Sequence, residues 1–63
     1  MKLKIVNDET FLLAVNSMKV RDIKINKIDV AKRMIVFNRD GRFTTMLKDF
    51  KEIGIDLLKF VGA

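Results

Sequence analysis

The stretch that decides the predicted fold is MIVFNRDGRFTTML, residues 34–47. Residues 34–37 are apolar and partly β-branched, which favours a strand, and the alternation over residues 43–47 favours a second strand. Between them, Asn38 and Gly41 stand at the first and fourth positions of NRDG, where a type I turn prefers Asn and Gly. The stretch therefore predicts an antiparallel hairpin with a projecting turn.

Further strands are predicted upstream of this hairpin. Residues 2–6 place Leu3 and Ile5 on one face and two lysines on the other, as in a half-buried strand. Residues 20–30 are rich in β-branched side chains, but the alternation of their isoleucines changes phase near Asn26. We therefore expect a bulge or bend at that point.

Residues 7–18 allow two interpretations. The unbroken apolar run at residues 11–15 is short and is bounded by polar residues, like a central strand that follows a turn. Alternatively, Asn7 or Asp8 caps a helix that continues to about Met18 and carries an apolar stripe at helical spacing. We favour the strand, and the helix is the alternative.

The C-terminal segment predicts an amphipathic helix. Asp49, followed by Glu52, resembles a capping box, and Gly62 provides a stop. The apolar face of such a helix would cover the sheet or bind a second chain, and a glycine within it would allow close approach. The expected interface residues are Phe50, Ile53, Gly54, Ile55, Leu57, Leu58 and Val61.

Together these elements predict one α+β domain over residues 1–63: a small antiparallel sheet of four or five short strands, in a hairpin or meander, covered by one C-terminal amphipathic helix. The composition is 49% hydrophobic and includes neither Cys nor His. Chains this short often rely on disulfides, metals or oligomerisation, and we expect no disulfide, metal or cofactor here. A homo-oligomer or a protein partner is therefore expected to cover part of the apolar surface.

The net charge of +5 is concentrated in one segment. Residues 19–42 hold eight bases and three acids, whereas the remaining residues hold five of each. Such a cluster of bases suits contacts with the phosphates of DNA or RNA. The candidate phosphate-binding residues are Lys24, Lys32, Arg33, Arg39 and Arg42.

No motif for catalysis or for a small-molecule substrate is present, because nucleophilic and acid–base chemistry would lack Cys and His and the three glycines are isolated. The longest uncharged stretch, residues 10–18, is too short to cross a membrane, and we expect a cytoplasmic protein without a secretory signal. We therefore expect a non-catalytic, nucleic-acid-associating regulatory or architectural module. The alternative is a protein-interaction module that self-assembles or docks on a larger protein through its apolar helix or a strand edge.

Overall fold

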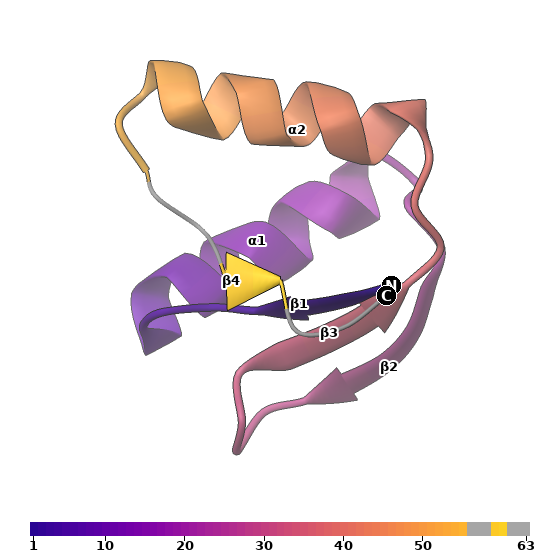
Figure 1. Cartoon of the computed structure of the whole chain (residues 1–63), viewed down its shortest axis with the longest axis vertical. Helices are drawn as coiled ribbons and strands as arrows, with labels where there is room; N and C mark the ends of the chain where they lie inside the picture. Colours follow the sequence, from indigo (N-terminus) through magenta and orange to yellow (C-terminus); the bar gives the residue numbers. More distant parts are fainter. Residues whose placement is uncertain (56–58, 61–63) are drawn as a thin grey trace.

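The computed structural model describes residues 1–55 and 59–60. Its elements are β1 (Lys2–Lys4), α1 (Asp8–Val20), β2 (Ile25–Asp29), β3 (Met34–Phe37), α2 (Gly41–Glu52) and β4 (Lys59–Phe60). The strands form an antiparallel sheet in the order β2-β3-β1-β4, and both helices lie on the same side of it (Figure 1). This element order and strand order define a split βαβ, or ferredoxin-like, arrangement.

The predicted architecture of one C-terminal helix over four or five strands is wrong. A three-stranded sheet, β2-β3-β1, carries the short β4 beside β1, and the two helices stand at N-terminal and middle positions of the chain. Two segments that we predicted as strands, residues 11–15 and 43–47, are helical. Three other predictions are confirmed: Leu3 and Ile5 share the buried side at β1, residues 34–37 form a strand, and the β2–β3 register shifts between residues 25 and 27.

For residues 7–18 the structure has the helix, α1, and not the favoured strand. The Asn7 side-chain oxygen accepts a hydrogen bond of 2.8 Å from the Thr10 backbone N–H, which caps the first turn. The buried residues of α1 follow helical spacing and are Phe11, Ala14, Val15 and Met18. The apolar run resembled a strand because Leu12 and Leu13, which complete it, lie on the exposed side of the helix.

Helix α2 replaces the predicted hairpin. The Asp40 carboxylate accepts hydrogen bonds from the backbone N–H groups of Arg42 (2.8 Å) and Phe43 (3.3 Å), so NRDG is a helix cap and not a reverse turn. Phe43, Met46 and Phe50 recur at helical spacing and are buried. The alternation that suggested a strand depended on Thr45, whose hydroxyl donates to the Gly41 carbonyl within the helix.

Gly54 ends α2, and it does not lie inside a longer helix as predicted. Its φ of 78° is left-handed, its N–H donates to the Lys51 carbonyl (3.1 Å), and the Ile55 N–H donates to the Phe50 carbonyl (2.9 Å). These two bonds form a Schellman motif with glycine at its usual position. Asp49, the predicted cap, lies instead in the last turns of α2, where its carboxylate accepts a 2.6 Å bond from the Arg21 guanidinium.

The predicted interface residues therefore do not share one helix face. Phe50 belongs to the core, Ile53 is 67% exposed and Ile55 is partly buried against the core. Leu57, Leu58 and Val61 lie outside the described residues.

The two halves of the chain repeat each other in structure. Helix α1 ends in the same motif as α2: the Asp22 N–H donates to the Lys19 carbonyl and the Ile23 N–H donates to the Met18 carbonyl. Equivalent positions lie 32 residues apart, as in the pairs Leu3 and Ile35, Phe11 and Phe43, Met18 and Phe50, and Ile23 and Ile55. Each βα unit thus supplies matching apolar positions to one shared core.

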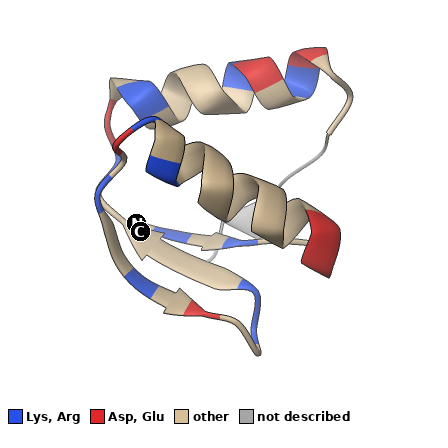
Figure 2. Cartoon of the chain, turned by 180° about the vertical axis from the view of Figure 1, so that it is seen from behind, with Lys and Arg blue, Asp and Glu red and all other residues tan. Residues whose placement is uncertain are grey.

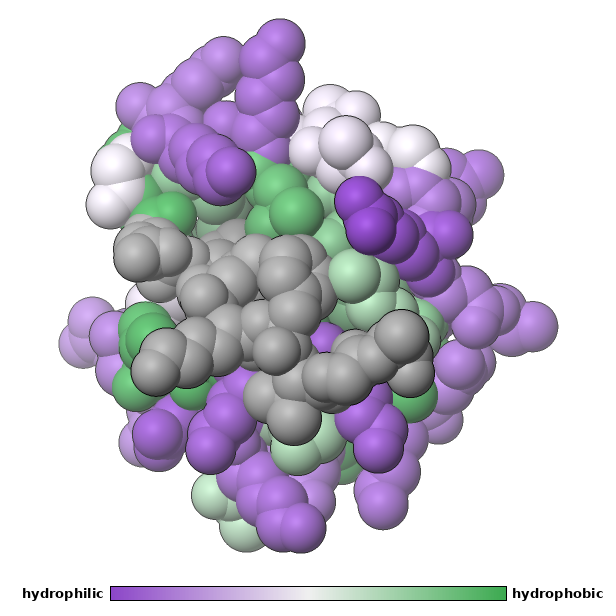
Figure 3. Space-filling model, in the orientation of Figure 1, coloured by the Kyte–Doolittle hydropathy of each residue, from purple (hydrophilic) through white to green (hydrophobic). Residues whose placement is uncertain are grey.

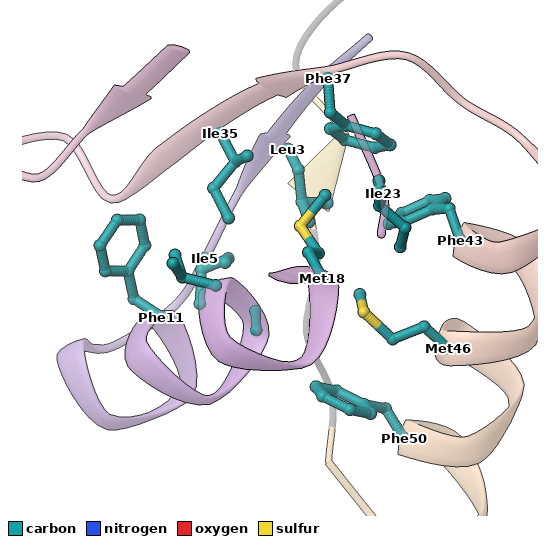
Figure 4. Packing of buried hydrophobic residues seen from close by; sticks show 12 residues of the cluster. Leu3, Ile5, Phe11, Met18, Ile23, Ile35, Phe37, Phe43, Met46 and Phe50 are labelled. Atoms are coloured by element: carbon teal, nitrogen blue, oxygen red, sulfur yellow. The ribbon is translucent and has the colours of Figure 1, made fainter. Parts of the chain in front are cut away.

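That core fills the space between the sheet and the two helices (Figure 4). Leu3 and Ile35, opposite each other in neighbouring strands, are fully buried. The ring of Phe37 lies 4.4 Å from that of Phe43 between centroids, which joins β3 to α2. Within residues 1–55, the remaining buried hydrophobic residues are Ile5, Phe11, Ala14, Val15, Met18, Ile23, Met46 and Phe50.

The Schellman assignment predicts opposite effects for the same substitution at two glycines. Gly54→Ala is expected to lower the free energy of unfolding by about 1 kcal/mol, because alanine resists positive φ. Gly41→Ala is expected to raise it by about 0.5 kcal/mol, because Gly41 begins α2 without positive φ. A Cβ meets nothing within 4 Å at either site, so backbone conformation decides the sign. Urea denaturation measures both, and effects of equal sign would contradict the assignment.

Candidate nucleic-acid interface

The sheet has one face that neither helix covers (Figure 1). Residues directly opposite each other in neighbouring strands point to the same side, and Leu3 and Ile35 point toward the helices. The alternate residues therefore point to the open side. They form two cross-strand rows, which are Lys27–Val36–Lys2 and Asp29–Met34–Lys4.

The open face is basic at its rim and apolar at its floor. Met34 and Val36, both from β3, are half-buried, while Lys2, Lys4 and Lys27 beside them are exposed. A hollow of about 280 Å³ lies over this floor, and it is lined by Lys2, Lys27, Asp29, Lys32, Met34 and Val36. Figure 3 shows hydrophilic side chains projecting from the side of the molecule on which the strands lie. We call the set Lys2, Lys4, Lys27, Asp29, Lys32, Met34 and Val36 the open basic face.

The five phosphate-binding candidates divide between two ends of the sheet. Lys24 precedes β2, and its carbonyl accepts a bond from the N–H of Asn38, so Arg39 and Arg42 lie at that same end. Lys32 and Arg33 lie in the turn from β2 to β3, at the other end of the five-residue β2. At the rise of a strand the two ends are about 15 Å apart. The structure does not bring these candidates together into one patch.

Arg33 is held by contacts within the fold. Its Nε donates to the Ile5 carbonyl (3.1 Å) and its guanidinium lies 3.5 Å from the Asp8 carboxylate. Its own carbonyl accepts a bond from the Ile5 N–H, and its φ of 51° is left-handed. Arg33 therefore joins the β2–β3 turn to the end of β1 and the start of α1.

Arg42 likewise connects two parts of the fold. It stands in the first turn of α2 and donates from its guanidinium to the Asp22 carbonyl at 2.9 Å. That carbonyl belongs to the turn at the end of α1. Lys24 and Arg39 are exposed at this end of the sheet, close in sequence to Asp22 and Asp40, which reduce its net charge.

Three of the lysines on the open basic face were not among the sequence candidates. Lys2 and Lys4 belong to the part of the sequence that is neutral overall, so counting charge by segment passed over them. Their alternation with Leu3 and Ile5 did predict that they point to solvent. Only the pairing of β1 with β3, and of β3 with β2, places them beside Lys27 and Met34.

The described aromatic side chains do not contribute to this face. Stacking on bases would require exposed aromatic rings. Phe37 and Phe43 are both fully buried, and Phe11 and Phe50 also belong to the core. The open basic face can therefore offer ammonium groups to phosphates and an apolar floor to bases or sugars.

Comparison with known proteins adds no functional information, because no family model, no curated protein and no solved structure matches the chain. Among residues 1–55 and 59–60, no group of three acidic side chains is arranged to hold a metal ion. None of the helices in the same residues has the length and apolar content needed to span a membrane.

The contacts of Arg33 predict that it stabilises the fold, unlike its neighbour Lys32. Arg33→Ala is expected to lower the free energy of unfolding by about 1 kcal/mol, because it removes the hydrogen bond to the Ile5 carbonyl and keeps the left-handed backbone. Lys32→Ala, at an exposed position, is expected to change it by less than about 0.5 kcal/mol. Chemical denaturation of both variants measures the difference, and equal small effects would show that Arg33 has no structural role.

Proposed function

We propose that this protein is a non-catalytic binding protein that holds single-stranded nucleic acid across its open basic face. The observation that supports this most directly is that Lys2, Lys27 and Lys32 line a hollow over a half-buried apolar floor, together with Asp29. Lys4 stands beside the same floor, opposite Met34. The Asp29 carboxylate also accepts a bond from the Lys32 backbone N–H, which shapes the turn. The lysines would contact phosphates, and Met34 and Val36 would contact bases or sugars.

A single strand fits this face better than a duplex. Reading the major groove of a duplex requires a helix or a two-stranded ribbon that projects into it. The projecting turn that we predicted at residues 38–41 is the start of α2 and packs at the end of the sheet. An open sheet face, in contrast, accommodates an extended single strand along its surface.

The composition of the face also indicates the mode of binding. Without a described aromatic side chain on it, stacking is expected to be weak, and phosphate contacts would dominate the affinity. Binding would then tolerate many sequences and would depend strongly on salt. Such behaviour suits a small architectural or regulatory protein, and a cytoplasmic location, also supported by the lack of cysteine, is part of this proposal.

Salt dependence tests the proposal. Fluorescence anisotropy with a labelled single-stranded oligonucleotide is expected to give a plot of log K against log salt with a slope of about −3, since four neutralised phosphates contribute about −0.7 each. The double variant Lys2→Gln/Lys27→Gln removes two contacts that flank Val36. It is expected to bind more weakly and to flatten the slope to about −1.4.

A control double variant of equal net charge distinguishes a specific binding site from a general effect of charge. Lys48→Gln/Lys51→Gln gives the same net charge but alters exposed residues of α2, in the helical layer. This control is expected to bind nearly as well as the unaltered chain and to keep its slope. Equal loss of binding in the two double variants would contradict a site on the open basic face, as would tighter binding of a duplex of equal length.

A further inference from the structure

Helix α1 has an outward side that is uncharged in its centre, where exposed leucines lie beside Asn16, and oppositely charged at its two ends. Leu12, Leu13 and Val20 are 61%, 44% and 82% exposed, so this helix carries three of the large exposed apolar side chains. Glu9 is exposed in the first turn and Lys19 in the last. Figure 2, which looks onto α1, shows acidic residues at one end of the helix, a base near the other and uncharged residues between.

We propose that this side of α1 binds a second copy of the same chain, with the two α1 helices antiparallel about a twofold axis near residue 14. Glu9 and Lys19 lie five residues before and after that position, about 15 Å apart along the helix axis. An antiparallel pair brings Glu9 of each copy to Lys19 of the other, twice in each dimer, and encloses Leu12 and Leu13 between them. A parallel pair would place like charges side by side.

Charge identifies the occupant as a second copy. Two molecules of net charge +5 repel each other, and the open basic face concentrates that repulsion on the sheet side. Two exposed acids, Asp8 and Glu9, stand at the first turn of α1 and an exposed base, Lys19, stands at its last turn. Asp8 lies 3.5 Å from the Arg33 guanidinium, so this side of α1 carries no excess positive charge and is complementary to itself. It is thus the surface on which two copies meet with least repulsion and with their exposed leucines covered.

The dimer would leave both binding faces free. The buried side of α1 rests on the sheet, so its outward side points away from the strands and from the open basic face. Two copies joined through α1 therefore expose their sheets on opposite sides of the assembly. The inference does not depend on the proposed function, because self-association is measured without nucleic acid.

Charge reversal tests the inference by sedimentation equilibrium. The unaltered chain is expected to approach twice its mass of 7.3 kDa as its concentration rises. Glu9→Lys and Lys19→Glu are each expected to weaken dimerisation about tenfold, since each turns two attractive pairs into repulsive ones. The double variant Glu9→Lys/Lys19→Glu restores both pairs and is expected to dimerise within about threefold of the unaltered chain.

These variants distinguish Glu9–Lys19 ion pairs between two copies from an effect of net charge and from an effect of the helix dipole. Lys19→Glu lowers the net charge to +3, so general repulsion alone would strengthen its association, whereas pairing weakens it. The double variant places a base at the first turn of α1 and an acid at its last turn, and both oppose the helix dipole. If Glu9 and Lys19 acted only through the dipole, this variant would be a less stable monomer and its dimerisation would not be restored. A chain that stays monomeric at all concentrations, or a Lys19→Glu variant that associates more strongly, would overturn the inference.

An apolar pair of variants locates the surface. Leu12→Gln is expected to weaken dimerisation, and Ile53→Gln, at an equally exposed position beyond the end of α2, is expected to leave it unchanged. Both side chains are more than half exposed, so both variants should keep the fold, which circular dichroism verifies. Equal weakening by the two would place the interface elsewhere and contradict the assignment to α1.

Discussion

The pairing of β1 with β3 is the constraint on which the rest of the structure depends. The register that sets Leu3 opposite Ile35 joins segments that are 32 residues apart and gives the two βα units one common face to cover. Both helices then pack on that face, and β1 has neighbours on both sides. Because side chains alternate along a strand, the same register fixes Lys2, Lys4, Met34 and Val36 on the opposite face. One strand pairing thus determines the shared core and the β1–β3 part of the candidate site, to which the β2–β3 pairing adds Lys27.

The parts of the fold that the sequence predicted are those where local pattern and tertiary structure agree. Lys2 to Val6 alternates because only one of its faces is buried, and the register shift next to Asn26 follows from the change of phase among the isoleucines. Where two patterns overlapped, α1 was only the alternative interpretation and α2 was not predicted over residues 41–48. Leu12 and Leu13 extend the buried stripe of α1 into an apparent strand, although both are exposed in the helix. NRDG suits a turn and a helix cap equally, and only the burial of the residues that follow it decides between them.

The candidate site could be predicted in kind but not in place. Charge counting correctly identified a basic chain, but it treated position in sequence as position in space. Arg33 and Arg42, which looked like free cations, each donate to a backbone carbonyl from another part of the fold, at Ile5 and Asp22. Arginine suits such roles because its planar fork donates in fixed directions. The lysines of β1 lie in a part of the sequence with no net charge, so charge counts do not indicate them. Only the strand order brings Lys2 into the same cross-strand row as Lys27.

Edge protection explains some of these lysines and not others. In the described part of the chain, β2 is an edge strand of the sheet. Lys24, Lys27 and the irregular register beside Asn26 are features that keep an edge from pairing with another chain. Lys4 belongs to β1, which pairs with β3 on one side and β4 on the other, so it protects no edge. A sheet face that is only solvated needs polar residues, but their charge can have either sign. On the open basic face, the polar residues beside Met34 and Val36 are mainly lysines. Lys4, which has paired strands on both sides, therefore supports a role in binding anions more than the basic edge does.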